Sequence, residues 1–274
     1  MTREMIITEL NNRGYNADLQ NSIKNGVVLE GIRISTNSNV APIIYTDSII
    51  ENAEEQHKTL NDVVSAIINI YESNKEINFD VNLFFDREYI LKNIRIGMQK
   101  DSNENIEKKA CNLEGIESYL YIKGNGEKDG YYSVKVSKFI LDYVNISEHE
   151  AWKKAEEYTN AETKITSMAK IMCEMMNMEY SEEMEDMTPF YVLTNTSNVK
   201  GASSILNKKA LSEFGKNHNV EKIVVLPSSV HEMLLVPYTE EIAIDTFSEM
   251  VKEVNNAEVD PTERLTDRAY IITL

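Results

Sequence analysis

The sequence has little of what holds disulfide-rich or zinc-binding domains together. It has two cysteines, Cys111 and Cys173, which lie far apart in the chain. The four histidines provide no closely spaced pair of ligands: His57, His149, His218 and His231. A tetrahedral zinc site needs ligands at short spacings, and disulfides are rare inside cells. We therefore expect two free thiols, no metal and no cofactor.

Long apolar runs are also missing. No stretch approaches the ~18 consecutive apolar residues that cross a membrane. Residues 1–10 mix charged and apolar side chains and lack the apolar core of a signal peptide. We therefore expect a cytoplasmic protein that does not act at a membrane.

Positive charge is scarce. The chain has 28 Lys and Arg residues against 45 Asp and Glu residues, and its net charge is −17. Such a surface repels nucleic-acid backbones, so direct binding to DNA or RNA is not expected. Two explanations remain for the excess of carboxylates. They keep the protein soluble, or they imitate phosphates toward a basic partner that binds nucleic acid.

The overall composition is that of a folded protein, with 42% hydrophobic and 27% charged residues. Periodicity predicts an α+β chain in three parts. These are an N-terminal α/β unit over 1–100, a variable middle with a hairpin and helices over 101–186, and a C-terminal βαββαβ unit over 187–274. The last unit is expected to form an antiparallel sheet covered by helices. The oligomeric state is left open.

Local patterns give the elements of the first unit. Asn25-Gly26 is a turn signal, and residues 27–45 are predicted to form a hairpin with a polar loop over 35–39. Apolar residues three and four apart predict a helix over 60–71. A further helix is predicted over 84–98.

The middle part contains a glycine-rich loop and a methionine-rich helix. Strands are predicted on both sides of loop 124–130, so the loop lacks the helix start that a phosphate cradle requires. It is expected to be a hairpin tip. A helix is predicted over 163–178, and its methionines are interpreted either as core packing, the commoner case, or as an adaptable binding groove.

One turn of the C-terminal unit carries candidate catalytic residues. It contains Ser228, Ser229, His231 and Glu232, the residue types that a nucleophile and its general base use. Their close spacing instead favours a turn in which serine side chains bond to the backbone.

A second loop, between the first strand and the first helix of this unit, carries candidate ligand-binding residues. These are Asn195, Lys200, Gly201 and Ser203. The predicted helix N-terminus would attract an anion. Helix capping accounts for the same residues without a ligand.

Several motifs follow one another in a fixed order along the chain. They are NGVVLEG (25–31), NVAPIIY (39–45), YVLTN (191–195), LPSSVHE (226–232) and MVKEVN (250–255). In these motifs the sequence resembles a family of uncharacterised bacterial proteins, a domain of unknown function found mainly in Firmicutes and often near mobile genetic elements. The resemblance covers nearly the whole chain, more loosely over 100–186, and implies no reaction, substrate or cofactor.

The acidic charge, the missing catalytic motifs and this resemblance together predict a non-enzymatic protein-binding or regulatory factor of a bacterial mobile element. A sharper version is an acidic inhibitor of a basic enzyme that processes nucleic acid or serves in defence. The alternative is a hydrolase-like enzyme that uses Ser228 or Ser229 with His231 and Glu232. That alternative requires a concave pocket at the turn.

Overall fold

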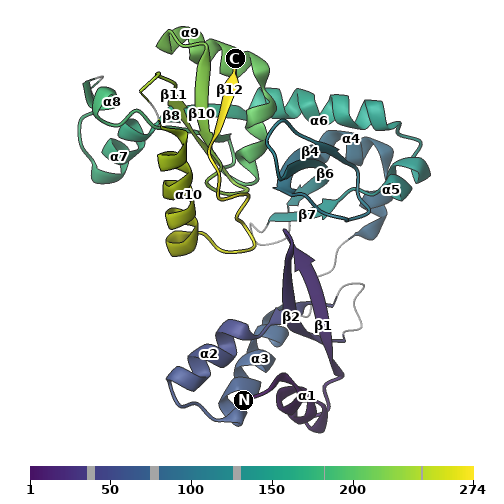
Figure 1. The fold of residues 1–274 in the computed structure, drawn as a ribbon. Helices are drawn as coiled ribbons and strands as arrows, with labels where there is room; N and C mark the ends of the chain where they lie inside the picture. Colours follow the sequence, from purple (N-terminus) through teal and green to yellow (C-terminus); the bar gives the residue numbers. More distant parts are fainter. Residues whose placement is uncertain (36–40, 75–79, 126–130, 182, 242) are drawn as a thin grey trace. The chain divides into compact units, whose positions relative to one another are not determined.

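The computed structural model describes the whole chain except residues 36–40, 75–79, 126–130, 182 and 242. The chain forms two compact units, residues 1–83 and 84–274 (Figure 1). Helices accompany antiparallel sheets in both units, which confirms the predicted α+β class. The predicted boundaries at 100 and 186 stay a prediction. Most of the polar loop 35–39 and the tip of the glycine-rich loop lie outside the described residues.

The first unit packs helices against a sheet of order β1-β2-β3. Its elements are α1 (Arg3–Asn12), β1 (Ala17–Lys24), β2 (Val27–Ile34), β3 (Ile43–Tyr45), α2 (Asp47–Glu55) and α3 (Leu60–Asn74). Asn25 and Gly26 connect β1 to β2, and both have positive φ, as a two-residue type I′ turn requires. The predicted hairpin over 27–45 is confirmed, because β2 pairs with β3. The sequence pattern missed β1, because Asn21 interrupts its alternation of apolar and polar residues.

The second unit begins with a sheet in which β6 pairs with three other strands. Its elements are η1 (Val81–Phe85, which continues from the first unit), α4 (Arg87–Asn93), β4 (Ile94–Lys100), β5 (Lys108–Ala110), β6 (Ile116–Asn125), β7 (Tyr131–Lys135), α5 (Lys138–Tyr143) and α6 (Glu148–Glu162). The apolar face of this sheet shares one buried cluster with α4, α5 and α6.

The second sheet of this unit has the order β12-β10-β11-β9-β8, and all its pairs are antiparallel. Its elements are β8 (Thr163–Ser167), α7 (Met168–Met176), α8 (Glu183–Met187), β9 (Tyr191–Asn195), η3 (Gly201–Leu206), α9 (Lys208–His218), β10 (Lys222–Leu226), β11 (Met233–Pro237), α10 (Ile244–Glu258) and β12 (Tyr270–Thr273). From β9 onward this is the predicted βαββαβ order. Ile223 and Val225 belong to one buried cluster, and Val224 and Leu226 to another, so β10 is covered on both faces.

Two predicted helices are wrong in part. The helix predicted over 84–98 ends at Asn93, and Ile94–Lys100 is a strand in which Ile94, Ile96 and Met98 recur with period two. The helix predicted over 163–178 begins as β8, because its threonine and isoleucine residues favour a strand and pair with β9. No helix in the described part of the chain is long and apolar enough to span a bilayer.

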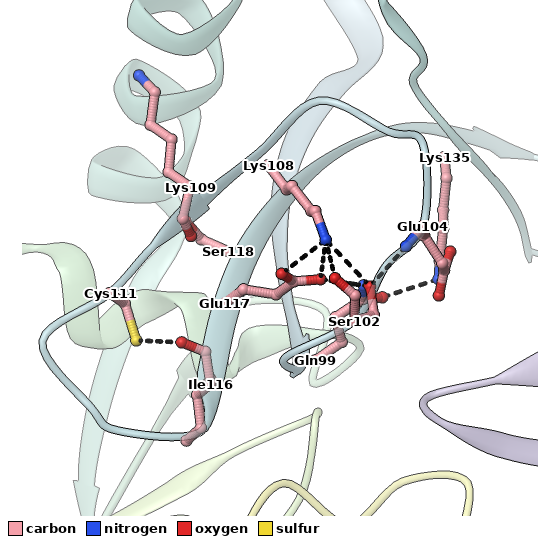
Figure 2. Close-up of polar contacts among 10 residues, drawn as sticks. All are labelled: Gln99, Ser102, Glu104, Lys108, Lys109, Cys111, Ile116, Glu117, Ser118 and Lys135. Atoms are coloured by element: carbon pink, nitrogen blue, oxygen red, sulfur yellow. Dashed lines mark hydrogen bonds and ion pairs between the residues drawn. The ribbon is translucent and has the colours of Figure 1, made fainter.

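The face of β6 that carries Glu117 holds a buried hydrogen-bond network (Figure 2). Glu117 accepts hydrogen bonds from Ser102 Oγ (2.6 Å) and Gln99 Nε2 (2.7 Å), and lies 3.0 Å from Lys108 Nζ. Burial alone would raise the pKa of Glu117. The hydrogen bonds from Ser102, Gln99 and Lys108 outweigh it and hold this pKa below the ordinary value.

Glu117→Gln should lower the free energy of unfolding by about 1–3 kcal/mol, because it leaves the partly buried Lys108 without its carboxylate. A carboxyl with a depressed folded pKa contributes stability above its ordinary pKa of 4.5 and loses it as the pH falls through the folded value. The variant should therefore lose less stability than wild type when the pH falls below 4.5.

Urea denaturation on either side of that pH measures both effects. The matched control is Glu157→Gln, which removes an exposed pair with Lys154 and should leave the midpoint unchanged. Equal destabilisation by the two variants would contradict the special role of Glu117.

Candidate functional site

The two loops with predicted site residues lie side by side at one end of the second sheet. Met233 of β11 lies opposite Leu193 of β9 in an antiparallel pair, so the loop after β9 meets the turn before β11. Thr194 Oγ1 donates a hydrogen bond to the carbonyl of His231 at 2.9 Å. The structure thus brings the two predicted residue sets into contact.

Asn195 organises the first loop through its side chain. Its Oδ1 accepts hydrogen bonds from the amides of Ser197 (3.1 Å) and Val199 (3.3 Å), and its Nδ2 donates to the carbonyl of Val199 (2.8 Å). Asn198 and Lys200 both adopt the left-handed backbone conformation. Asn195 therefore holds a tight turn, a role typical of asparagine.

Gly201 begins η3 where there is no space for a side chain. A Cβ there would lie 2.3 Å from Thr194 Oγ1 and 2.7 Å from the carbonyl oxygen of His231. The next amide, of Ala202, donates to the carbonyl of Val230 at 3.3 Å. Carbonyl groups of the neighbouring turn thus fill the space at the start of η3. The anion site predicted there therefore has little support.

The serines of η3 bond to the backbone. Ser203 Oγ donates to the carbonyl of Lys200 at 3.4 Å, and Ser204 Oγ donates to the carbonyl of Thr194 at 2.8 Å. The first helix predicted for the C-terminal unit is in fact divided. The 3₁₀ helix η3 ends at Leu206, and Asn207 caps α9 by accepting a hydrogen bond from the amide of Ala210.

The imidazole of His231 has a partner at each nitrogen. Its Nδ1 accepts a hydrogen bond from the Lys200 amide at 3.1 Å, so the proton of the neutral ring resides on Nε2. Nε2 lies 3.3 Å from Glu263 Oε1. The carbonyl of Glu263 also accepts from the amide of Val230 at 2.9 Å. Sequence patterns gave no indication of Glu263.

The serines of the turn do not approach the imidazole as nucleophiles. Ser229 Oγ accepts a hydrogen bond from the backbone amide of His231 at 3.0 Å, and the Ser229 amide donates to the carbonyl of Glu232 at 3.1 Å. The side chains of Ser228 and Glu232 form no hydrogen bond with any other described residue. The geometry thus favours the backbone-bonded turn over a nucleophile–base pair.

Lys200 connects these loops to the first sheet of the same unit. Its Nζ donates to the hydroxyl of Tyr119 at 2.9 Å and lies 5.6 Å and 5.4 Å from the ring centroids of Tyr119 and Tyr121. Burial lowers the pKa of the Lys200 ammonium, and the charge of Glu263 partly opposes this. Lys200 therefore acts as a bridge between two sheets.

The methionine-rich segment forms a surface, so its interpretation as core packing is wrong. Met172, Met175, Met176 and Met178, which we call the methionine surface, are 45, 83, 65 and 55% exposed. Only Ala169 and Cys173 of α7 are buried. Both Cys111 and Cys173 are free thiols, as predicted.

The methionine surface lies in the most one-sidedly charged part of the chain. Residues 172–187 contain six methionines, six acidic residues and no lysine, arginine or histidine. Glu174, Glu179 and Glu183 are exposed. The segment thus combines exposed methionines with exposed carboxylates.

The fold is α+β, and the turn that contains the predicted catalytic residues is held by hydrogen bonds to its neighbours. The family model of DUF5688, a family of unknown function, matches residues 2–272. The chain belongs to this family, which confirms the expected membership of a family of unknown function. No curated protein and no solved structure matches the chain.

His231→Ala should lower the free energy of unfolding by about 1–2 kcal/mol, because it leaves the Lys200 amide and Glu263 without their shared partner. Urea denaturation measures the change. His149→Ala, at an exposed position of α6, should leave the midpoint unchanged. An esterase activity that Ser229→Ala and His231→Ala abolish without loss of stability would contradict this structural role.

Proposed function

We propose that this chain is a protein-binding factor that holds a basic amphipathic helix of a partner on the methionine surface. The observation that carries the proposal is the set of four exposed methionines beside carboxylates, in a segment without basic residues. Exposed apolar clusters on folded proteins mark interaction sites.

The spacing of the methionines suits a helix as the ligand. Met172, Met175 and Met176 lie at positions i, i+3 and i+4 of α7 and therefore share one face. Methionine is unbranched and polarisable, and it adapts to partners of different shape. A partner helix with its own apolar stripe would cover this face in the way that helices occupy apolar grooves.

The charge of the chain supports a basic partner. Glu174, Glu179 and Glu183 border the methionine surface, and the net charge of −17 attracts cationic proteins over longer distances. Enzymes that process nucleic acid present Lys- and Arg-rich segments. This supports the more specific proposal of an acidic inhibitor of such an enzyme. A mobile-element setting rests on the family resemblance alone.

The hydrolase-like alternative has less support. Both nitrogens of His231 already have partners, and Ser229 Oγ is bonded to a backbone amide. A base needs a free ring nitrogen within reach of its nucleophile. The turn would have to rearrange before either serine could be activated.

A designed peptide tests the protein-binding proposal. The peptide has roughly 18 residues of Lys and Leu, about five helical turns, with the leucines on one face. We expect it to bind wild type in a fluorescence anisotropy titration. The double variant Met175→Ala, Met176→Ala should bind about tenfold more weakly. Met250→Ala, at a 41% exposed methionine of α10, should bind like wild type.

A scrambled peptide of the same composition separates apolar docking from charge attraction. It should bind much more weakly than the amphipathic peptide. High salt should weaken binding of the amphipathic peptide without abolishing it, because apolar contacts are not screened. Equal binding of both peptides would overturn the proposal.

A further inference from the structure

A groove of about 410 Å³ lies between β8, β9, α8 and α9. Three rings contact one another along it. The centroid of Tyr191 lies 4.9 Å from that of Phe214 and 4.6 Å from that of His218, and Phe214 lies 4.1 Å from His218. Aromatic faces of this kind attract cations and stack with guanidinium groups.

The groove is lined by two carboxylates, Glu185 and Glu213, together with the polar side chains of Thr163, Ser167, Asn217 and His218. Glu185 accepts hydrogen bonds from the hydroxyls of Tyr180 (2.6 Å) and Tyr191 (3.1 Å). The bond from Tyr180 lowers the pKa of Glu185, although burial opposes it, so the carboxylate is ionised at neutral pH. Among the described residues, no lysine or arginine lies within ion-pair distance of Glu185.

His218 and Glu213 provide further acceptors in the groove. The Nδ1 of His218 lies 2.8 Å from the carbonyl of Phe214, which can only accept, so Nδ1 carries the proton and Nε2 is an acceptor in the neutral ring. Within the described residues Nε2 has no hydrogen-bond partner. Glu213 is exposed, and in the described part of the chain Lys209 Nζ, at 3.9 Å, is the only basic group within ion-pair distance of its carboxylate.

The groove adjoins the methionine surface through α8. The sulfur of Met184 lies 3.5 Å from that of Cys173 in α7, and the next residue, Glu185, lines the groove. Ser167, which caps α7, lines the groove as well. A helix that covers the methionines can therefore extend a side chain into the groove.

We propose that the groove binds an arginine side chain of the basic partner helix. The planar guanidinium has donors for the carboxylates of Glu185 and Glu213 and a flat face for the rings. This inference rests on the proposed function, because it names the site at which one arginine of the same partner helix would bind.

Free arginine tests the groove without the peptide. N-acetylargininamide is titrated into the full chain while the ring signals of His218 are followed by NMR. We expect a saturable shift with an affinity in the millimolar range. N-acetylcitrullinamide, which has a similar shape but no charge, should cause none. N-acetyllysinamide that binds as tightly as the arginine probe would overturn the assignment to arginine.

Two variants locate the probe. Glu185→Gln and Glu213→Gln should each weaken the binding of N-acetylargininamide by about fivefold to tenfold, as expected for loss of one charged contact. Glu213 holds no other element in place, so its variant tests the groove even if Glu185→Gln alters the fold. Glu249→Gln, at an exposed position of α10, should bind the probe like wild type. Unchanged binding by both groove variants would overturn the proposal.

The outcomes also separate this inference from the proposed function. The methionine double variant could lose peptide binding while N-acetylargininamide causes no shift at His218. That result would overturn the assignment of the groove to arginine and leave the proposed function standing. A specific His218 shift with no binding of the amphipathic peptide would overturn the proposed function and leave the groove as an arginine site without the partner helix.

Discussion

The pairing of β11 with β9 is the constraint on which the second unit depends. Met233, Leu234 and Leu235 lie opposite Leu193, Val192 and Tyr191, although the two segments are distant in the sequence. Closing such a long loop costs entropy, and burial of both strands offsets that cost. The same pairing brings both predicted site loops to one end of the sheet and leaves β8, with α7 after it, at the sheet's edge.

Some of the few basic residues form ion pairs within the second unit. Lys108 pairs with Glu117, Lys135 with Glu104 and Arg95 with Glu162, all around one face of β6. Each of these three basic residues is matched by a carboxylate. Residues 172–187, around the methionine surface, include six acidic residues and no basic residue, so the local potential there is negative.

The elements that could be predicted from the sequence are those that depend on patterns of neighbouring residues. The order βαββαβ was predictable because continuous apolar runs such as Lys222–Leu226 mark strands covered on both faces. Sequence reasoning missed β4 and β8, because the helices predicted over 84–98 and 163–178 extend across these two segments, although β4 has period two and β8 is rich in threonine and isoleucine. It also missed Glu263 and Tyr119, whose contacts with His231 and Lys200 depend on tertiary pairing. Helical spacing of methionines is the same for a core and a surface, so only the structure shows their exposure.

The methionine surface also makes the protein sensitive to oxidants. Peroxide converts an exposed thioether into a sulfoxide, which is polar and chiral. At 83% exposure, Met175 is open to this reaction, whereas Cys173 lies buried beneath it in the same helix. Oxidation would turn an apolar docking face into a polar one while the sheet below stayed intact. Reductase repair of the sulfoxide would restore the thioether, so oxidation of the proposed docking face would be reversible.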